Sequence, residues 1–383
     1  MTDALEVREV RTRRDLRRFL DVPYLVYRGD PHWIAPLRQE VKKLLSRTKN
    51  PFFEHAEACY WIAERDGRPV GRISAQVNRL HLETHRDATG NFGFLEAIDD
   101  AAVFEALLAT AADWLRARGM KCMLGPYSPS INDEIGVMVA GFGRPSVIGM
   151  AYSPRYYAAR LEAAGFAKAK DVHALLFDMA GDDIREVDRL KRVTDRVNAS
   201  GQFTIRPIDM RRFETEMRNA IDVYNDAWSE NWGFVPVTEA EVKHLIASVR
   251  PIVDPKYVLL GEVDGELEAI FMTLLNLNEA IADLGGRLAP FGWAKLLWRL
   301  KRRPFKSGRV MLAGVRRRHR NSLLSPALLS QMLARTIETG RVSGVDWLEL
   351  SWILEDNARS MALCRRAGGR IYKTYRIYEK PLV

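Results

Sequence analysis

Hydrophobic and polar residues follow a clear order in the last part of the chain. Residues 309–315 form a short apolar run bounded by turn residues, which indicates a buried strand. Apolar residues then recur at helical spacing over 326–339, and Gly340 is expected to end that helix. The elements expected next are two further strands, 347–353 and 371–378, with a short helix between them. The pattern predicts the order strand, loop, helix, strand, helix, strand.

The loop between the first strand and the helix, residues 316–322, is strongly basic, with four arginines and His319. A helix N-terminus that follows a strand attracts anions, because its first backbone N–H groups and the positive end of the helix dipole point at the loop. Arginine adds planar, bidentate contacts to phosphate. The sequence therefore predicts an anion-binding site. An ordinary strand–helix unit with a solvated basic loop is the alternative.

Two halves of the chain, 1–180 and 203–383, follow the same plan. Each begins with a short strand and a helix, followed by two apolar runs joined by an Asp-Gly pair at positions 66–67 or 264–265. Asp-Gly favours a tight hairpin because both residues tolerate positive φ. Two related domains are therefore expected. The charged segment 181–202 between them has apolar residues at helical spacing and is interpreted as a linker helix.

The first half lacks the basic loop. Its corresponding strand leads into Asp99 and Asp100 and then a long helix. Two aspartates at a helix N-terminus provide a good cap but a poor phosphate site. The first half is therefore expected to shape the substrate side or to act as scaffold.

This order of elements resembles the GCN5-related N-acetyltransferase (GNAT) superfamily, whose strand–loop–helix unit binds the pyrophosphate of an acyl-CoA. The family loop reads V-x-P-x-x-R-G-x-G-x-G/A. Val315 and Arg320 match it, Arg317 stands at the proline position, and the glycine positions hold Asn321, Leu323 and Ser325. The resemblance implies an α/β fold class: two GNAT-like domains in tandem, each a central, mostly antiparallel mixed sheet flanked by helices. The domain 1–180 would be degenerate, and 203–383 would bind acyl-CoA.

Several phrases also resemble a bacterial subgroup of tandem GNAT proteins, and they lie in both halves: 90–96, 125–136, 156–166 and 224–236. The best-known members are bacterial ceramide synthases, which transfer a fatty acyl group from acyl-CoA to the amine of a sphingoid base. The resemblance thus implies an acyl-CoA-dependent N-acyltransferase that acts on a primary amine.

Two irregular stretches carry further candidates. Residues 125–136 place Asn132, Asp133 and Glu134 in a loop between apolar residues, which fits either a functional loop or an Asx turn or helix cap. Residues 224–236 are dense in aromatic residues, which fits either a site for a large apolar substrate or a plug of the core.

The resemblance assigns roles to these residues. Glu134 or Asp133 would be the general base, and Tyr375 or Tyr372 would protonate the leaving thiolate. Backbone N–H groups of the strand ending at Val315 would hold the carbonyl oxygen. The residues expected to bind acyl-CoA are Val315, Arg317, Arg318, Arg320, Asn321, Ser322 and Asn357. The residues expected to contact the acceptor are Asn132, Tyr152, Trp228, Asn231 and Trp232.

The composition of the chain indicates what kind of partner it binds and in which compartment it works. The chain has 383 residues, a formal net charge of +9 and a pI near 9.4, which favours anionic partners. Its three cysteines are far apart, which indicates a reducing compartment. The polar, charged N-terminus and the lack of a long apolar run predict neither a signal peptide nor a transmembrane helix. A cytoplasmic protein is expected, with peripheral attachment to the inner face of the cell membrane.

That attachment is expected through residues 290–307, where tryptophan and leucine are mixed with cations and no acidic residue occurs. This composition is typical of a helix in an anionic membrane interface, and a charged surface helix that covers the sheet is the alternative. No metal site is expected, since His81 and His85 lack the H-E-x-x-H order and an evident third ligand.

Two other functions fit the same sequence. A tandem GNAT-like fold could take its acyl group from aminoacyl-tRNA, as the Fem-type peptidoglycan aminoacyltransferases do, and the positive charge would then serve RNA. The chain could also be a peripheral lipid-binding protein that no longer holds CoA. Nucleic acid is the less expected partner.

Overall fold

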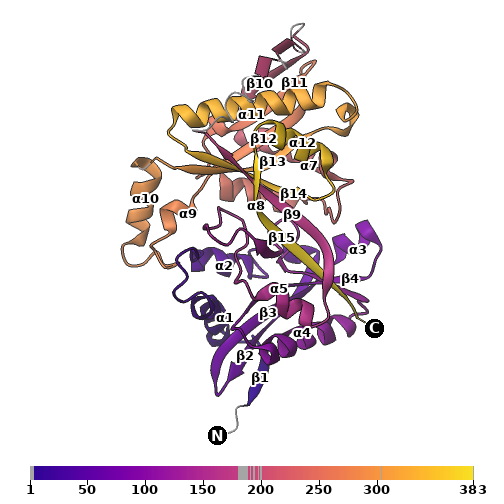
Figure 1. Cartoon of the computed structure of the whole chain (residues 1–383), viewed down its shortest axis with the longest axis vertical. Helices are drawn as coiled ribbons and strands as arrows, with labels where there is room; N and C mark the ends of the chain where they lie inside the picture. The colour runs from indigo at the N-terminus through magenta and orange to yellow at the C-terminus, as the bar shows by residue number, and fades with distance from the viewer. Residues whose placement is uncertain are drawn as a thin grey trace. The chain divides into compact units, whose positions relative to one another are not determined.

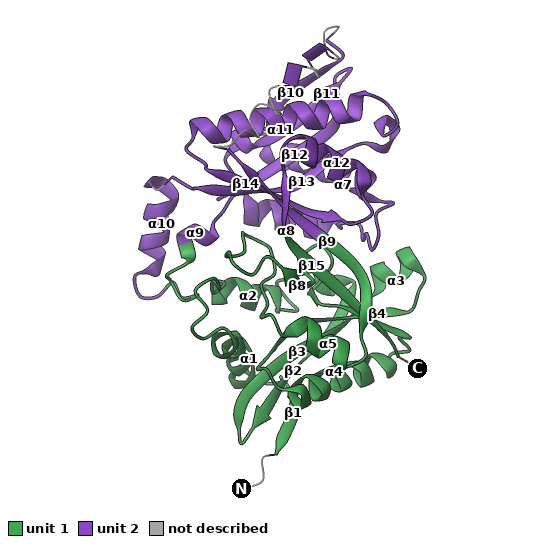
Figure 2. Ribbon diagram, in the orientation of Figure 1, with its two compact units in different colours: residues 1–172, 281–288, 373–383 green, residues 173–280, 289–372 purple. Residues whose placement is uncertain are grey.

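The computed structural model (Figure 1) describes residues 4–179, 189, 191–192, 195–196, 198, 201–302 and 304–382. Its contacts divide the chain into two compact units (Figure 2). Unit 1 comprises residues 1–172, 281–288 and 373–383, and unit 2 comprises 173–280 and 289–372. The predicted linker helix, 181–202, lies outside the described residues except for these isolated positions and residues 201–202.

Unit 1 contains a mixed sheet with the strand order β1-β2-β3-β4-β5-β15. Its strands are β1 (Leu5–Glu9), β2 (Ala56–Arg65), β3 (Arg68–Asn78), β4 (Thr89–Ala97), β5 (Cys122–Gly125) and the end of β15 (Arg370–Pro381), which also pairs with β8 (Val137–Ala140). β4 and β5 are parallel, whereas the other pairs are antiparallel. Two short strands, β6 (Tyr127–Ser128) and β7 (Glu134–Ile135), pair separately. The helices are α1 (Arg13–Val26), α2 (Arg38–Leu44), α3 (Arg79–His85), α4 (Ala101–Arg116) and α5 (Tyr157–Ala163), with a 3-10 turn η1 (Pro51–Glu54).

Both faces of the unit 1 sheet are covered, because successive strand residues point to opposite faces. Trp61 and Ala63 of β2 pack with Leu107 of α4 in one buried cluster. Ile62, which lies between them, packs with Phe19 of α1 in another. The continuous apolar runs of β2 and β3 are therefore explained by burial on both sides.

Unit 2 repeats this plan with the strand order β9-β14-β13-β12-β11-β10. Its strands are the end of β9 (Ala167–Asp178), β10 (Phe203–Pro207), β11 (Val258–Val263), β12 (Glu266–Leu275), β13 (Ser307–Val315) and β14 (Trp347–Leu354). The helices are α7 (Phe213–Trp228), α8 (Glu239–Val249), α9 (Asn278–Ile281), α10 (Gly292–Arg302), α11 (Leu324–Val342) and α12 (Ala358–Arg366), with 3-10 turns η2 (Pro255–Tyr257) and η3 (Arg317–His319). Leu328, Leu333 and Ile337 of α11 pack on the sheet as their helical spacing predicts.

The internal repeat is confirmed down to local backbone geometry. Both hairpin turns have positive φ at each central residue: 49° and 72° at Asp66 and Gly67, and 51° and 83° at Asp264 and Gly265. Each hairpin also has a register shift shortly before its turn, after Ala63 in unit 1 and after Gly261 in unit 2. The same bulges in both copies indicate one ancestral backbone plan.

The last strand of each repeat continues into the other unit. β9 starts in unit 1 and ends in unit 2, while β15 starts in unit 2 and ends in unit 1, where Tyr378–Pro381 pairs with β5. The compact units therefore differ from the predicted domains 1–180 and 203–383, because residues 373–383 belong to unit 1. Sequence order alone does not reveal such an exchange.

Candidate functional site

The two parallel strands of unit 2 separate part of the way along. β13 and β14 pair from Ser307 and Trp347 to Val310 and Leu350, where the parallel pairing ends. β13 continues to Val315 and β14 to Leu354, so a gap opens between them, called the unit 2 wedge below. A register shift against β12 falls at the same point, between Met272 and Thr273. Strands that lose a neighbour leave alternate N–H and C=O groups directed into the gap, ready for a ligand.

A cavity of about 100 Å³ occupies the unit 2 wedge, and its lining is mostly apolar. β13 contributes Val310, Met311 and Ala313, and β14 contributes the five residues 350–354. The remaining lining includes Leu329 and Leu333 of α11 and Leu363 and Cys364 of α12. A mostly apolar cavity with a few polar groups is the usual form of a ligand site.

Three of the predicted site residues line this cavity: Trp228, Asn231 and Asn357. The Trp228 indole N–H donates to the Ala313 carbonyl oxygen at 3.1 Å, and its ring lies 5.8 Å from the ring of Trp352. The aromatic stretch 224–236 thus contributes both to the cavity and to the core, since Phe234 and Val235 are buried. Trp232 is half-buried in the same segment and does not line the cavity.

The arginines of the basic loop follow β13, as predicted, and they face carboxylates at the end of α7 and on β12. Arg317 pairs with Glu230 at 2.8 Å, and Arg320 pairs with the same carboxylate. Arg318 donates to Glu268 at 2.7 Å. These hydrogen bonds, first from Arg320 and then from Arg317, hold the pKa of Glu230 below its usual range. A phosphate that binds these guanidinium groups would therefore have to displace the carboxylates that are paired with them.

Polar side chains near this loop bond to backbone groups at the starts of α11 and α12. The Ser322 hydroxyl accepts from the Leu324 N–H at 3.2 Å and donates to the His319 carbonyl at 2.8 Å. The Asn321 side chain accepts from Arg359 at 3.1 Å. Asn357 caps α12 by accepting from the Ser360 N–H at 3.1 Å. The last predicted residue, Val315, is buried where β13 ends.

The corresponding place in unit 1 is filled by the chain itself. β4 and β5 pair from Thr89 and Cys122 to Asn91 and Leu124, where the pairing ends. The segment that follows β5 occupies the space beyond this point. Gln76 donates to the carbonyl oxygens of Tyr127 and Pro129 at 2.8 and 2.9 Å. A side chain at Gly93 would collide with the Tyr127 carbonyl, its Cβ lying 1.6 Å away. The first half thus retains the strand arrangement but not an open wedge, and Asp100 caps α4 as predicted.

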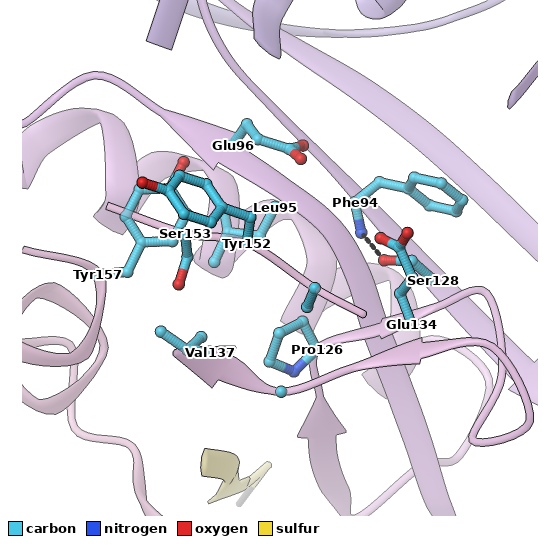
Figure 3. A pocket seen from close by; sticks show the side chains of 12 residues that line it. Phe94, Leu95, Glu96, Pro126, Ser128, Glu134, Val137, Tyr152, Ser153 and Tyr157 are labelled. Carbon is cyan, nitrogen blue, oxygen red and sulfur yellow. Dashed lines mark hydrogen bonds between the residues drawn. The ribbon is translucent and has the colours of Figure 1, made fainter. Parts of the chain in front are cut away.

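A smaller, more polar cavity of about 50 Å³ remains beside this segment (Figure 3). Figure 3 shows Glu134 beside Ser128, whose hydroxyl accepts the Phe94 N–H at 2.9 Å. Glu134 is exposed, whereas Glu96 on the other side is paired with Arg72. Of the predicted residues, Glu134 and Tyr152 line this cavity.

The neighbours of Glu134 also have structural roles. Asp133 closes a tight turn by accepting from the Ser130 hydroxyl at 2.7 Å and the Ser130 N–H at 3.2 Å, while Asn132 is exposed. Tyr152 donates to Asp30 at 2.7 Å, and burial together with this hydrogen bond raises the tyrosine pKa. Asp133 therefore fits the interpretation of this stretch as a turn. Glu134, which lines the cavity, fits the interpretation as a functional loop.

The two predicted tyrosine acids lie in different units. Tyr375 is fully buried in unit 1, where β15 pairs with β8 at Met138. Tyr372 is half-buried in unit 2, and its hydroxyl donates to Glu349. Of the two tyrosines, only Tyr372 therefore belongs to the same unit as the wedge.

Sequence reasoning missed a group of polar residues at the closed end of the wedge. Arg309 and Glu349 lie opposite one another on β13 and β14, and Ser351 follows at the point where the strands part. Both charged side chains are buried. A charge inside a buried strand is costly unless it is paired, so an arginine and a glutamate within apolar runs were the signal that could have revealed the group.

His81 and His85 share α3 with ring centroids 4.6 Å apart, and the Asp87 carboxylate lies 3.3 Å from His81. Within the described residues, no three His, Cys, Asp or Glu side chains form a group that could hold a metal ion. The helices of these same residues also lack the combination of length and apolar character that a membrane crossing requires.

No protein-family model matches the chain. Over 379 residues it is 43% identical to a bacterial ceramide synthase from Caulobacter vibrioides (strain NA1000 / CB15N), with 99% of this chain and 98% of that protein covered. It is also 39% identical over 376 residues to Protein YghO from Escherichia coli (strain K12), with 98% and 95% covered.

Two solved structures share the fold over 99% of the chain. A tandem GNAT protein from the clavulanic acid biosynthesis pathway superposes with a TM-score of 0.57 at 15% identity and is covered over 99% of its length. A GCN5-related N-acetyltransferase from Sphaerobacter thermophilus superposes with a TM-score of 0.52 at 13% identity and is covered over 96%. The predicted α/β, tandem GNAT fold is confirmed. The chain is therefore an N-acyltransferase of tandem GNAT fold, and it belongs to the family of the bacterial ceramide synthase of Caulobacter vibrioides.

Proposed function

We propose that the chain transfers a long-chain acyl group from acyl-CoA to the primary amine of a sphingoid base. The main support for acyl-CoA as the donor is the unit 2 wedge, a mostly apolar cavity between two parallel strands that separate. It is narrow, and backbone groups of both strands border it, which suits the extended pantetheine arm with its two amides. The arginines after β13 suit the CoA phosphates.

Two observations support a sphingoid base as the acceptor: the name of a close relative and the residues that line the wedge cavity. A protein 43% identical over nearly the whole chain is named a ceramide synthase. Trp228 and Trp352 give the wedge aromatic surface for an alkyl chain, and Asn231 gives it an amide for a hydroxyl or amine group. A sphingoid base offers both kinds of group.

The reaction moves two protons from nitrogen. A protonated amine first loses one proton, for which Glu134 is the proposed base and Asp133 the alternative. The nitrogen lone pair then attacks the thioester carbon, and backbone N–H groups of β13 support the charge that develops on oxygen. As the C–S bond breaks, sulfur keeps the electron pair and takes a proton, for which Tyr372 or Tyr375 is the proposed donor. The products are an amide, free CoA thiol and one proton released to solvent.

We also propose that α10, which is labelled in Figure 1, meets an anionic membrane surface. Four large apolar residues on or next to this helix are exposed: Phe291 by 79%, Trp293 by 56%, Leu297 by 51% and Trp298 by 62%. Its inner side is fixed by buried Arg299, which donates to the Ala280 carbonyl at 2.7 Å. Lys301 and Arg302 extend the two exposed rows that contain Leu297 and Trp298. Tryptophan flanked by cations fits the interface of an anionic bilayer.

Thiol release tests the function. The protein is incubated with acyl-CoA of several chain lengths, a sphingoid base and a thiol reagent, and the lipids are examined by mass spectrometry. Amine-dependent release with an N-acylated product is expected. The protein's own thiols should react slowly, because burial raises the pKa of Cys59 to about 11 and that of Cys364 to about 12.

No release at any chain length would overturn the acyl-CoA reaction. Tight, RNase-sensitive RNA binding would then favour an aminoacyl-tRNA donor. A lack of any thermal protection by CoA would favour a lipid-binding protein without catalysis.

A further inference from the structure

Arg309 and Glu349 are charged residues in the middle of a sheet, with exposed fractions of 4% and 0%. They face one another across the last part of the β13–β14 pairing. Burying charges is costly unless hydrogen bonds and an opposite charge compensate. A fold that needed only a stable sheet would be served by apolar residues there, as at Val310 and Leu350, the next pair along. The retained charges call for a chemical explanation.

The contacts form a continuous chain of hydrogen bonds. The Arg309 guanidinium donates to the Ser351 hydroxyl oxygen at 3.0 Å. The Ser351 hydroxyl donates to one oxygen of Glu349, and the Tyr372 hydroxyl donates to the other. Arg309 therefore fixes the orientation of Ser351, so that the serine proton points at the carboxylate. Glu349 joins two hydroxyl groups through its two oxygens.

One end of this chain opens into the unit 2 wedge. Ser351 lines the cavity and is the first residue of β14 beyond the last pair with β13. A thioester whose carbonyl lay at the parting of the strands would have the Ser351 hydroxyl beside it. Neither Glu349 nor Tyr372 is part of the cavity lining. Glu349 would reach the acceptor nitrogen through Ser351, and the relay requires the departing sulfur to lie beside Tyr372 at the closed end of the wedge.

We propose that Ser351, Glu349 and Tyr372 form a proton relay from the acceptor nitrogen to the departing sulfur. This inference rests on the proposed function. The second proton on nitrogen passes to the Ser351 oxygen while the serine proton passes to Glu349. The Tyr372 proton passes to the thiolate, and the proton on Glu349 then passes to the Tyr372 oxygen. One proton leaves nitrogen and one reaches sulfur, so the three residues end in their starting state.

The relay explains why a carboxylate is buried at position 349, which a purely structural role does not explain. Glu349 gains and loses one proton per turnover, so the site carries no lasting change in charge. Ser351 and Tyr372 contribute hydroxyl groups, which can accept one proton while giving another. Arg309 is a positioning residue, because its guanidinium stays protonated.

Glu349→Gln keeps the shape of the side chain but cannot accept a proton. We expect its kcat to fall about 100-fold or more, with the KM for acyl-CoA within about threefold of wild type. Ser351→Ala and Tyr372→Phe should lower kcat in the same way. The double variant Glu349→Gln with Tyr372→Phe should be no slower than about twice the slower single variant, because both changes break one path.

Glu216→Gln is the matched control. Glu216 is also a buried carboxylate of unit 2 that accepts from two arginines, Arg206 and Arg212, and it does not line the wedge cavity. It should lose stability without losing kcat per folded molecule, as judged by circular dichroism.

A kcat of Glu349→Gln within threefold of wild type, or one that falls only with the folded fraction, would overturn the relay. Should this variant not fold, Ser351→Ala and Tyr372→Phe decide, since each removes only a hydroxyl: unchanged kcat in both would overturn it. A wild-type protein without turnover would instead overturn the proposed function, and the relay with it.

Discussion

Glu230, an exposed carboxylate just beyond α7, is ion-paired with Arg320 of the loop that follows β13. It binds Arg317 as well, so one carboxylate occupies two of the guanidinium groups predicted to hold CoA phosphates. Ion pairs between exposed side chains are weak, because water and salt screen them. Bidentate contacts of arginine to phosphate are stronger. Acyl-CoA should therefore displace Glu230 rather than be excluded by it.

Arg320→Ala should raise the KM for acyl-CoA about tenfold with kcat within about threefold, because it removes a phosphate contact that is the same in ground and transition states. Glu230→Gln should lower the KM, since the guanidinium groups lose their competitor. Initial rates at varied acyl-CoA concentration measure both. Arg341→Ala, an arginine in the last turn of α11, is the control. An unchanged KM in Arg320→Ala would remove the arginine loop from CoA binding.

Glu134→Gln should lower kcat at neutral pH by about 100-fold, the usual scale of a lost general base. The loss should shrink as pH rises, because more of the amine is then deprotonated without help. The pH dependence of kcat measures this. Glu105→Gln is the control, since Glu105 is an exposed carboxylate of α4 that does not line the cavity beside Glu134. Equal turnover of Glu134→Gln and wild type at pH 7 would eliminate Glu134 as the base.

Replacing Trp293 and Trp298 by serine should weaken binding to vesicles that contain phosphatidylglycerol by at least tenfold. Each cation near such a surface contributes about 1 kcal/mol, so binding should also fall with salt and in purely zwitterionic vesicles. Sedimentation with vesicles measures the bound fraction. Val342→Ser is the control, because Val342 is 87% exposed on α11, outside the α10 patch. Turnover of soluble short-chain substrates should not change, and equal vesicle binding by variant and wild type would exclude α10.

Thr12→Ala should lower the free energy of unfolding by about 1 kcal/mol at pH 7 through loss of the α1 cap. The Thr12 hydroxyl and, next, the Arg8 guanidinium hold the pKa of Asp15 well below its usual range. The stability from this carboxylate is thus present above about pH 4, the unfolded value, and is lost as pH falls towards the folded pKa. The cost of Thr12→Ala should accordingly shrink in acid. Urea unfolding at pH 7 and pH 3 measures it.

Thr84→Ala is the control for that series, because the Thr84 hydroxyl is exposed and bonds only within its own helix, to the Leu80 carbonyl. It should change stability by less than about 0.5 kcal/mol at either pH. If Thr12→Ala lowers the free energy of unfolding equally at both pH values, Asp15 is not the source of the pH dependence.

Local patterns made the repeat and the strand–loop–helix unit predictable. The Asp-Gly turns, the helical spacing in α11 and the Asp100 cap depend on residues close together in the chain. The pairing of Arg320 with Glu230 joins residues 90 positions apart, and no local pattern encodes it. The same limit applies to β15, whose alternation identifies a strand but not the sheet that receives it. Glu349 was visible as a charge within an apolar run, but its partners were not.

The exchange of the last strands has a consequence for how the protein is made. Unit 1 needs residues 373–383, so its sheet lacks a member until the ribosome has produced both repeats. Until then the free edge of β5 is a template for unwanted pairing. A chain stopped after the first repeat would keep that edge open indefinitely. Cutting the gene between the two repeats should therefore leave the first repeat with an incomplete sheet.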